Sequence, residues 1–285
     1  MSKLIRLVLP QWQGGNRIQY AYGAKILEFL APSSSCETIE LPVSMQLEKN
    51  HERDGIAYKN TLLDQTKSAI SILKEKNPDQ IVVFGGECSI SLAPFSYMLE
   101  KYPHNTAIIW FDRHADISIA GETTDYHAIV VTTLLGEGDP DFSSLVPQKI
   151  HDNKLLYVGV NDDEQFNRNV CHHHHLQNIP PEDFANDPSK IIDSLEKMHI
   201  DNVLIHFDVD VIDLATFRSQ SSANPDVYFE RLKYIHPGAS FSSLIHALNA
   251  IDQKYTIRCI SIAEYLPWDI MNLQNLLVQM PLLNK

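Results

Sequence analysis

Long apolar runs are absent from this sequence. No stretch approaches the roughly 18 apolar residues that a membrane-spanning helix requires. The apolar segment 4–9 is too short for a signal peptide and is followed at once by Pro10. We therefore expect a cytoplasmic protein that does not bind a membrane.

Cysteines are few and scattered. Cys36, Cys88, Cys171 and Cys259 lack the C-x-x-C spacing of zinc ribbons and redox motifs. We expect neither a disulfide framework nor a zinc ribbon, and reduced thiols suit the cytoplasm.

Basic residues are outnumbered, because 23 Lys and Arg face 36 Asp and Glu and leave a formal charge of -13. Nucleic acids and anionic membranes require basic patches, so both are excluded as partners. The charge would favour a small cationic substrate, but the same acidity equally serves solubility.

What the chain does contain is a regular alternation of apolar strands and helical stretches. Strands are predicted at 3–9, 80–84, 107–111, 155–160, 203–207 and 258–263, and helices at 20–30, 59–76, 89–101, 189–198 and 240–253. The alternation predicts an α/β fold whose parallel sheet is covered on both faces. We predict a single domain over 1–285, with surface excursions at 161–181 and 213–237.

Acidic clusters follow two of these strands. Asp112, His114 and Asp116 come directly after the strand at 107–111. Side chains alternate along a strand, so all three would project to one side if the extended backbone continued through them. Such a motif alone could equally be a solvated turn or a helix cap.

The second cluster, Asp208 and Asp210, follows the apolar segment 202–207 and would share a face in the same way. In open α/β sheets, sites form beyond the carboxyl ends of the strands, where both clusters would lie. Uncompensated carboxylates repel one another there, and a cation would remove that repulsion. The two clusters therefore favour a metal site.

Five stretches in order resemble the motifs of the ureohydrolase family, which comprises arginases, agmatinases, guanidinobutyrases and formimidoylglutamases. The family motifs G-G-D-H-S, D-A-H-x-D and S-x-D-x-D-x-x-D-P correspond here to GGECS from Gly85, DRHAD from Asp112 and HFDVDVIDL from His206. Asp125-Tyr126-His127-Ala128 resembles the family's loop ending in His-Gly, and Glu264-Tyr265-Leu266-Pro267 resembles its E-x-N-P. The resemblance implies a three-layer αβα arginase-like fold with a mostly parallel sheet of about eight strands.

The resemblance also implies a dinuclear site for two divalent ions, expected to be Mn²⁺. Asp112 and Asp208 would bridge the two ions, and His114 and Asp210 would complete one shell. Asp116 would complete the other shell together with position 88, where the family has histidine and this chain has Cys88.

Cys88 has three possible roles. It could be a ligand, a small buried thiol beside an incomplete metal position, or a nucleophile. A helix N-terminus at this point would favour the thiolate. Thiolate suits Zn²⁺ or Fe²⁺ better than Mn²⁺ and would make the ions poorer Lewis acids.

His206 replaces the family's usual small residue two positions before Asp208. On the same strand face it could be a compensating ligand. The alternative is a packed histidine that supports the ligands without touching the metal.

By resemblance, the activity is hydrolysis of a guanidino or amidino carbon–nitrogen bond, which releases urea or a formamide-type product and an amine. His127 would shuttle protons to the departing amine, since histidine titrates near neutral pH. Glu264 would accept N–H bonds from the guanidinium. Asp210 would accept a hydrogen bond from the attacking hydroxide and help to pass its proton.

The far end of the substrate would meet residues near the His127 loop and after the strand at 155–160. The candidates are Thr123, Asp125, Asp162 and Glu164. Asp125 stands where the arginase loop carries asparagine, and a carboxylate there would repel an α-carboxylate. A positive or neutral tail, as in agmatine, is therefore favoured, and a hydroxyguanidine is a further possibility.

The four consecutive histidines 172–175 could also suggest a metal site. They cannot all face one ion in any regular element, so we expect an exposed loop.

Two other classes remain open at this stage. One is a catalytically impaired metal-binding homologue that acts as a sensor or scaffold. The other is a mononuclear zinc amidohydrolase of the deacetylase type, which would leave Asp116 and Asp210 unexplained. The family resemblance further implies a homo-oligomer, either a trimer or a hexamer.

Overall fold

The computed structural model describes residues 2–47, 52–160, 174, 176–187, 189–225, 238–280 and 283. Its centre is an eight-stranded sheet in the order β2-β1-β5-β10-β9-β6-β7-β8. Every pair of neighbouring strands in it is parallel. The strands are β1 (Leu4–Leu9), β2 (Glu37–Glu40), β5 (Gln80–Gly85), β6 (Thr106–Phe111), β7 (Leu155–Val158), β8 (Gln177–Ile179), β9 (Asn202–Asp208) and β10 (Thr256–Ala263).

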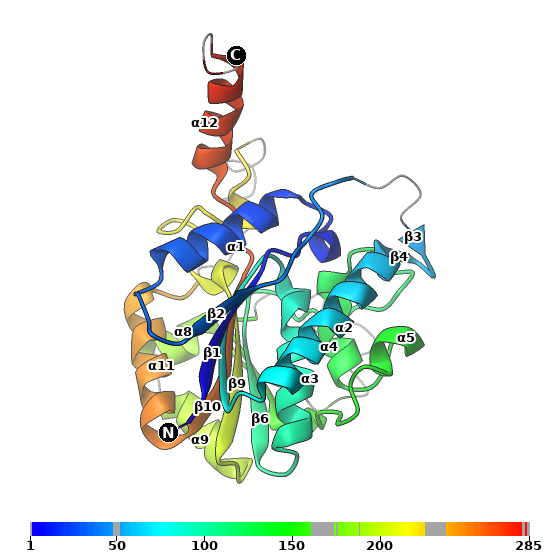
Figure 1. The fold of residues 1–285 in the computed structure, drawn as a ribbon. Coiled ribbons are helices and arrows are strands. Elements are labelled where there is room, and N and C mark those ends of the chain that lie inside the picture. Colours follow the sequence, from blue (N-terminus) through cyan, green and yellow to red (C-terminus); the bar gives the residue numbers. More distant parts are fainter. Residues whose placement is uncertain are drawn as a thin grey trace.

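Helices cover both faces of the sheet, as Figure 1 shows. One side carries α1 (Gln19–Leu30), α8 (Pro181–Asn186), α9 (Ser189–Lys197) and α11 (Phe241–Lys254), and the other carries α2 (Lys59–Lys76), α3 (Leu92–Lys101), α4 (Val130–Leu134) and α5 (Pro140–Ser143). A small antiparallel hairpin, β3 (Glu52–Arg53) and β4 (Ile56–Ala57), precedes α2. The predicted three-layer αβα fold is confirmed.

The side chains of strand β6 pack against the helices on both faces of the sheet. All of its residues are buried. Ile108 and Trp110 join the apolar cluster that includes α2 and α3, whereas Ile109 and Phe111 join the cluster of α9 and α11. Because alternate side chains point to opposite faces, a strand buried on both faces must be apolar throughout. Residues 107–111 are therefore all apolar, because β6 is buried on both faces.

The six predicted strands and five predicted helices are present, with shifts of a few residues at their ends. The helix predicted from residue 89 begins instead as a short 3-10 helix, Cys88–Ser91, and becomes α-helical at Leu92. Pro94 explains the later start, because proline has no N–H to donate and is tolerated only in a helix's first turn.

Several elements were not predicted. The edge strands β2 and β8 are short and mostly unburied, so they lack the apolar pattern of the central strands. The helix α12 (Trp268–Gln279) projects away from the rest of the molecule in Figure 1 and buries none of its residues. Within the residues listed above, no helix is both long and apolar enough to cross a membrane.

Candidate metal centre

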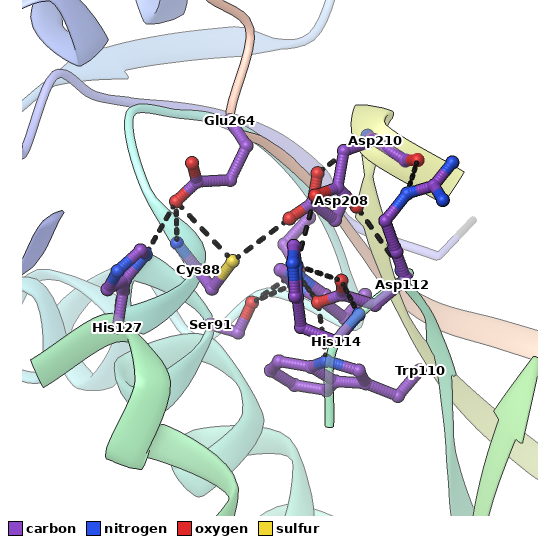
Figure 2. A network of polar contacts seen from close by, with 12 residues as sticks. Cys88, Ser91, Trp110, Asp112, His114, His127, Asp208, Asp210 and Glu264 are labelled. Carbon is purple, nitrogen blue, oxygen red and sulfur yellow. Dashed lines mark hydrogen bonds and ion pairs between the residues drawn. The ribbon is translucent and has the colours of Figure 1, made fainter. Parts of the chain in front are cut away.

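Four adjacent strands, β5, β10, β9 and β6, carry the motif residues at one edge of the sheet. Cys88 follows the end of β5, Glu264 follows β10, Asp208 ends β9, and Asp112 follows β6. The strands are parallel neighbours, so their carboxyl ends meet. Figure 2 shows these side chains pointing toward one another.

The clusters converge through turns, so the expected extended backbone through Asp112, His114 and Asp116 is wrong. The chain bends immediately after β6, where an Asp112 carboxylate oxygen accepts a hydrogen bond from the His114 N–H at 2.7 Å. Asp208 accepts one from the Asp210 N–H in the same way, also at 2.7 Å. Aspartate side chains favour such two-residue turns, and here the turns bring the ligand atoms together.

Four groups of described side chains have ligand atoms within 4.8 Å of one another. Two of these are Cys88 with His127 and Glu264, and Asp54 with Asp139 and Asp141; the other two both contain Asp112 and are the candidate metal groups. The first consists of Cys88, Asp112, Asp116 and His206, and the second of Asp112, His114, Asp208 and Asp210. Asp112 is common to both. The predicted ligands of each shell lie close together, except that Asp208 falls only in the second group, and His206 joins the first. The assignment of these residues to two ions stays a prediction.

Two site residues have backbone strain. Asp116 has φ of 49° and Glu264 has φ of 67°, in the left-handed region that non-glycine residues seldom adopt. The Glu264 N–H donates to the Gly86 carbonyl at 2.7 Å, which ties the end of β10 to the loop after β5. A Cβ at Gly86 would lie 1.8 Å from the Gln11 carbonyl oxygen, so only glycine fits there. Such strain is typical of functional sites.

The site opens into a cavity of about 230 Å³. Its lining comprises Gly15, Arg17, Tyr20, Cys88, His114, Asp116, Asp125, His127, Ala128, Asp208, Asp210, Ser221 and Glu264. Members of both metal groups and the predicted catalytic residues thus line one chamber.

The carboxylates repel one another strongly. Burial, together with the neighbouring carboxylates, raises the pKa of Asp112 and of Asp208 well above the usual range. Burial also raises the pKa of Asp116 to about 6, although His127 and His114 oppose this. Asp210 differs, because His114 and Arg113 outweigh the effect of burial and hold its pKa below the usual value.

Cys88 is 2% exposed and lies between two carboxylates, as Figure 2 shows. Its Sγ is 3.4 Å from Asp208 Oδ2 and 3.6 Å from Glu264 Oε1. Burial and the surrounding carboxylates raise the pKa of the thiol well above its ordinary value. In the absence of a cation, burial and these carboxylates therefore oppose the thiolate that a helix N-terminus would favour, and the role of Cys88 stays a prediction.

His206 is fully buried on β9. Burial lowers its pKa to about 3, so the imidazole is neutral. Its Nε2 has no hydrogen-bond partner within the described part of the chain, and Asp116 Oδ2 shares that condition.

His127 and Glu264 form a pair across the chamber, with Nδ1 and Oε1 2.9 Å apart. Burial lowers the pKa of His127, but the Glu264 and Asp116 carboxylates outweigh it and raise the pKa to about 10. Without a cation in the chamber, these carboxylates therefore favour the protonated form of His127, and its role as a proton shuttle stays a prediction.

The predicted substrate-binding residues have different outcomes. Asp125 lines the cavity, whereas Thr123 does not and instead accepts a hydrogen bond from the Asp125 N–H at 3.1 Å. Asp162 and Glu164 lie outside the described residues. Of the four histidines at 172–175, only His174 is described, and it pairs with Glu137 at 3.2 Å.

Four lining residues were missed by the sequence analysis: Gly15, Arg17, Tyr20 and Ser221. Arg17 and Tyr20 come from the segment around the start of α1, far from every motif in the sequence. Arg17 Nη1 is buried, and no group within the described residues accepts a hydrogen bond from it. No local pattern marks either residue, because only the packing of α1 over the sheet edge brings them to the cavity.

The donor set fits two divalent cations. Clustered buried carboxylates are costly without a positive charge, and the carboxylates and imidazoles present are ordinary ligands for Mn²⁺, Zn²⁺ and Fe²⁺. Fold and site together define a three-layer α/β protein with a buried acidic centre suited to a dinuclear metal site.

Comparisons with known proteins agree with this class. The sequence model of the arginase family matches residues 32–225. The chain is 21% identical over 281 residues to an arginase of Entamoeba histolytica, covering 93% of this chain and 91% of that one. The crystal structure of Entamoeba histolytica arginase in complex with L-ornithine matches with a TM-score of 0.76 at 18% identity, over 94% of this chain and 92% of that chain. The native arginase of Bacillus caldovelox matches with a TM-score of 0.74 at 16% identity, over 94% and 92%.

This chain belongs to the arginase family. The resemblance drawn from the five motifs is confirmed, and the family is one of binuclear metal hydrolases. The structure places Cys88, the chain's departure from the family motif, within one of the two candidate ligand groups.

Proposed function

We propose that this protein is a ureohydrolase that cleaves a guanidino or amidino carbon–nitrogen bond, giving urea or a formamide-type product and an amine. The observation that carries the proposal is one cavity lined by members of both candidate metal groups and by the His127–Glu264 pair. A planar guanidinium is a poor electrophile, so the reaction needs an activated water held close to the carbon.

Two divalent ions would be held by the two ligand groups, with Asp112 common to both. When bound, they would supply Lewis acidity and lower the pKa of water toward about 7. Mn²⁺ suits the carboxylates, whereas Cys88 would favour Zn²⁺ or Fe²⁺ at its own position.

Glu264 is the proposed anchor for the substrate cation. Its side chain is 4% exposed and faces the chamber. A charge-assisted pairing between this carboxylate and the guanidinium N–H groups would orient the carbon toward the ligand groups.

His127 would supply the proton for the departing amine. The protonated ring is held on Glu264 in the free enzyme. A cationic substrate that binds Glu264 would displace that contact and weaken the hold of Glu264 on the proton. Binding would thereby prepare His127 to donate.

Asp210 would stay ionised and accept a hydrogen bond from the attacking water. His114 Nδ1 lies 3.0 Å from its Oδ2, and the Arg113 N–H donates to its Oδ1 at 3.2 Å. These contacts fix the carboxylate and keep it charged.

For the substrate tail, Asp125 supports an amine or neutral group over a carboxylate. Agmatine or another guanidino amine is therefore preferred to arginine in this proposal. Arg17 lines the same cavity and would attract a carboxylate.

A sensor or scaffold without catalysis is not favoured, because a scaffold has no need of the His127–Glu264 pair in the chamber. A mononuclear deacetylase-type site would leave the second ligand group without a purpose.

The test measures metal per subunit after incubation with manganese, zinc or iron, and urea release over a panel of guanidino compounds. Wild type and Cys88→His are compared. About two ions with urea from one substrate supports the proposal and names the substrate. One ion or none and no urea, with both restored in Cys88→His, would show that Cys88 has disarmed the site.

A further inference from the structure

His206 is held in a single orientation by its surroundings. Its Nδ1 lies 2.8 Å from Ser91 Oγ and 3.4 Å from Ser261 Oγ, and the two hydroxyls are 2.7 Å apart. The ring stacks on Trp110 with centroids 3.7 Å apart and an angle of 18° between the planes. One ring nitrogen is therefore engaged, and the other points in a fixed direction.

That other nitrogen, Nε2, is directed at the ligand group of Cys88, Asp112 and Asp116. It lies 3.9 Å from Asp112 Oδ2, which is too long for a hydrogen bond. Two ligands whose bonds to one ion are each about 2 Å can stand this far apart. Leaving a buried ring nitrogen without a hydrogen-bond partner is unfavourable, so a partner is expected there.

From these contacts we propose that His206 Nε2 is a metal ligand, and that it supplies the imidazole which position 88 no longer provides. The chain has exchanged two residues of its family's motifs: cysteine replaces histidine at 88, and histidine replaces a small residue at 206. In space the two positions belong to one ligand group, so the exchange moves the imidazole from the end of β5 to β9.

Ser91 completes the arrangement. Metal-binding histidines nearly always donate their second ring N–H to a neighbouring acceptor, which fixes the tautomer. The Ser91 hydroxyl is placed to accept from Nδ1 and leaves the Nε2 lone pair for a cation. Ser91 is therefore a positioning residue, and the neutral imidazole keeps the charge of the site as it would be with histidine at 88.

This inference rests on the proposed metal site, and metal binding tests it without reference to activity. Protein stripped by a chelator is dialysed against Mn²⁺ alone or Zn²⁺ alone, and bound metal is measured by elemental analysis. His206→Asn is the main variant, because its amide can keep the Ser91 contact while removing Nε2. Ser91→Ala is the matched control, because it keeps Nε2.

Wild type and Ser91→Ala should each hold two ions at saturation, with affinity in Ser91→Ala lowered about 10- to 100-fold. His206→Asn should hold one. Its metal-free form should unfold at the wild-type temperature, which separates lost ligation from lost structure. Two ions bound by His206→Asn with wild-type affinity would overturn the inference.

Two further measurements test the proposal if the His206→Asn variant fails to fold. Cobalt-loaded wild type should show, besides any signal from His114, a strongly shifted, slowly exchanging N–H signal from the His206 ring by NMR, and its absence would overturn the proposal. The double variant Cys88→His/His206→Ser should bind two ions, because the imidazole returns to position 88. If this variant binds two ions but the wild type shows no shifted His206 signal, His206 has a packing role only.

The outcomes also separate this inference from the activity. Wild type with two ions but no urea would overturn the proposed function and leave the His206 result standing. Wild type that releases urea while His206→Asn keeps both ions would overturn the inference alone.

Discussion

Glu264, the proposed anchor for the substrate cation, lies just past the end of β10 in a strained backbone conformation. Its carboxylate is 2.9 Å from His127 Nδ1. Glu264→Gln removes the charge and keeps the shape. A hydrogen bond to a charged group contributes about 1.5–3 kcal/mol, so kcat/KM for a guanidino substrate should fall about 10- to 150-fold. Steady-state kinetics measure this.

Metal content should stay at the wild-type level in Glu264→Gln, since Glu264 groups with Cys88 and His127 and is in neither of the two ligand groups that contain Asp112. Glu28→Gln, at an exposed position on α1, is the control and should change neither quantity. Unchanged kinetics in Glu264→Gln would remove the substrate-anchoring role.

Asp125 and Arg17 offer opposite charges to the substrate tail. Wild type should prefer agmatine to arginine by kcat/KM. Asp125→Asn should shift that ratio toward arginine, because a repelling carboxylate is lost, and Arg17→Met should shift it toward agmatine. A wild-type preference for arginine would contradict the assignment of Asp125.

At the scale of elements, α2 is joined to α5 through a buried charge. Lys59, the first residue of α2, is 1% exposed, and its Nζ lies 2.6 Å from Asp54 and Asp139 and 2.9 Å from Asp141. Asp139 also caps α5, where it accepts from the Asp141 and Phe142 N–H groups. Burial lowers the pKa of Lys59, but the hydrogen bonds to the three aspartates outweigh it and raise the pKa above its usual value.

Lys59→Met should lower the free energy of unfolding by about 3–5 kcal/mol, because Asp139 would be left buried without its partner. Denaturant unfolding measures it. Lys74→Met on the same helix breaks an exposed pair with Glu100 and should cost at most about 1 kcal/mol. Equal effects in Lys59→Met and Lys74→Met would contradict a buried ion-pair network.

The pH dependence of this network follows from the raised pKa. The stability that Lys59 contributes is fully present below the unfolded pKa of about 10.4 and is lost as the pH rises through the higher folded value. The difference in unfolding free energy between wild type and Lys59→Met should therefore shrink only in strong alkali.

At the scale of the whole molecule, metal removal should destabilise the fold. An ion that binds only the folded state stabilises it by about 2.7 kcal/mol at a hundred times its dissociation constant, so a chelator should lower Tm by about 5–10 °C. Differential scanning calorimetry of loaded and stripped protein measures this.

For Asp208→Asn, the difference in Tm from wild type should change sign between the metal-loaded and the stripped protein. Loaded, this variant should melt below wild type because a ligand is lost. Stripped, it should melt at or above wild type, because the carboxylate repulsion that raises the pKa of Asp208 is relieved. Stripped Asp208→Asn melting clearly below stripped wild type would argue against an uncompensated acidic centre.

Assembly is the second prediction at this scale. The family resemblance implies a trimer or hexamer, and α12 carries Ile270, Leu273, Leu276, Leu277 and Val278 in exposed positions. Light scattering on the purified protein should give a mass of several chains. The mass of a single chain would contradict the prediction.

The sequence by itself determined the central strands, the five longer covering helices and the family. Apolar runs buried on both faces of a parallel sheet are local patterns that can be read directly from the sequence. The motifs D-x-H-x-D and D-x-D are local as well, because their residues are close together in the chain. The edge strands β2 and β8 and the projecting α12 lack such patterns, because their residues are largely exposed and little in the core constrains them.

Only the tertiary structure decided the content of the site. The placement of Arg17 and Tyr20 at the cavity, the His127–Glu264 pair and the approach of His206 to Asp112 all depend on segments far apart in the sequence. The state of Cys88 was likewise decided in space, because the charge that holds its proton comes from carboxylates on other strands. A sequence fixes which donors exist, whereas distance and burial set which of them share a cation.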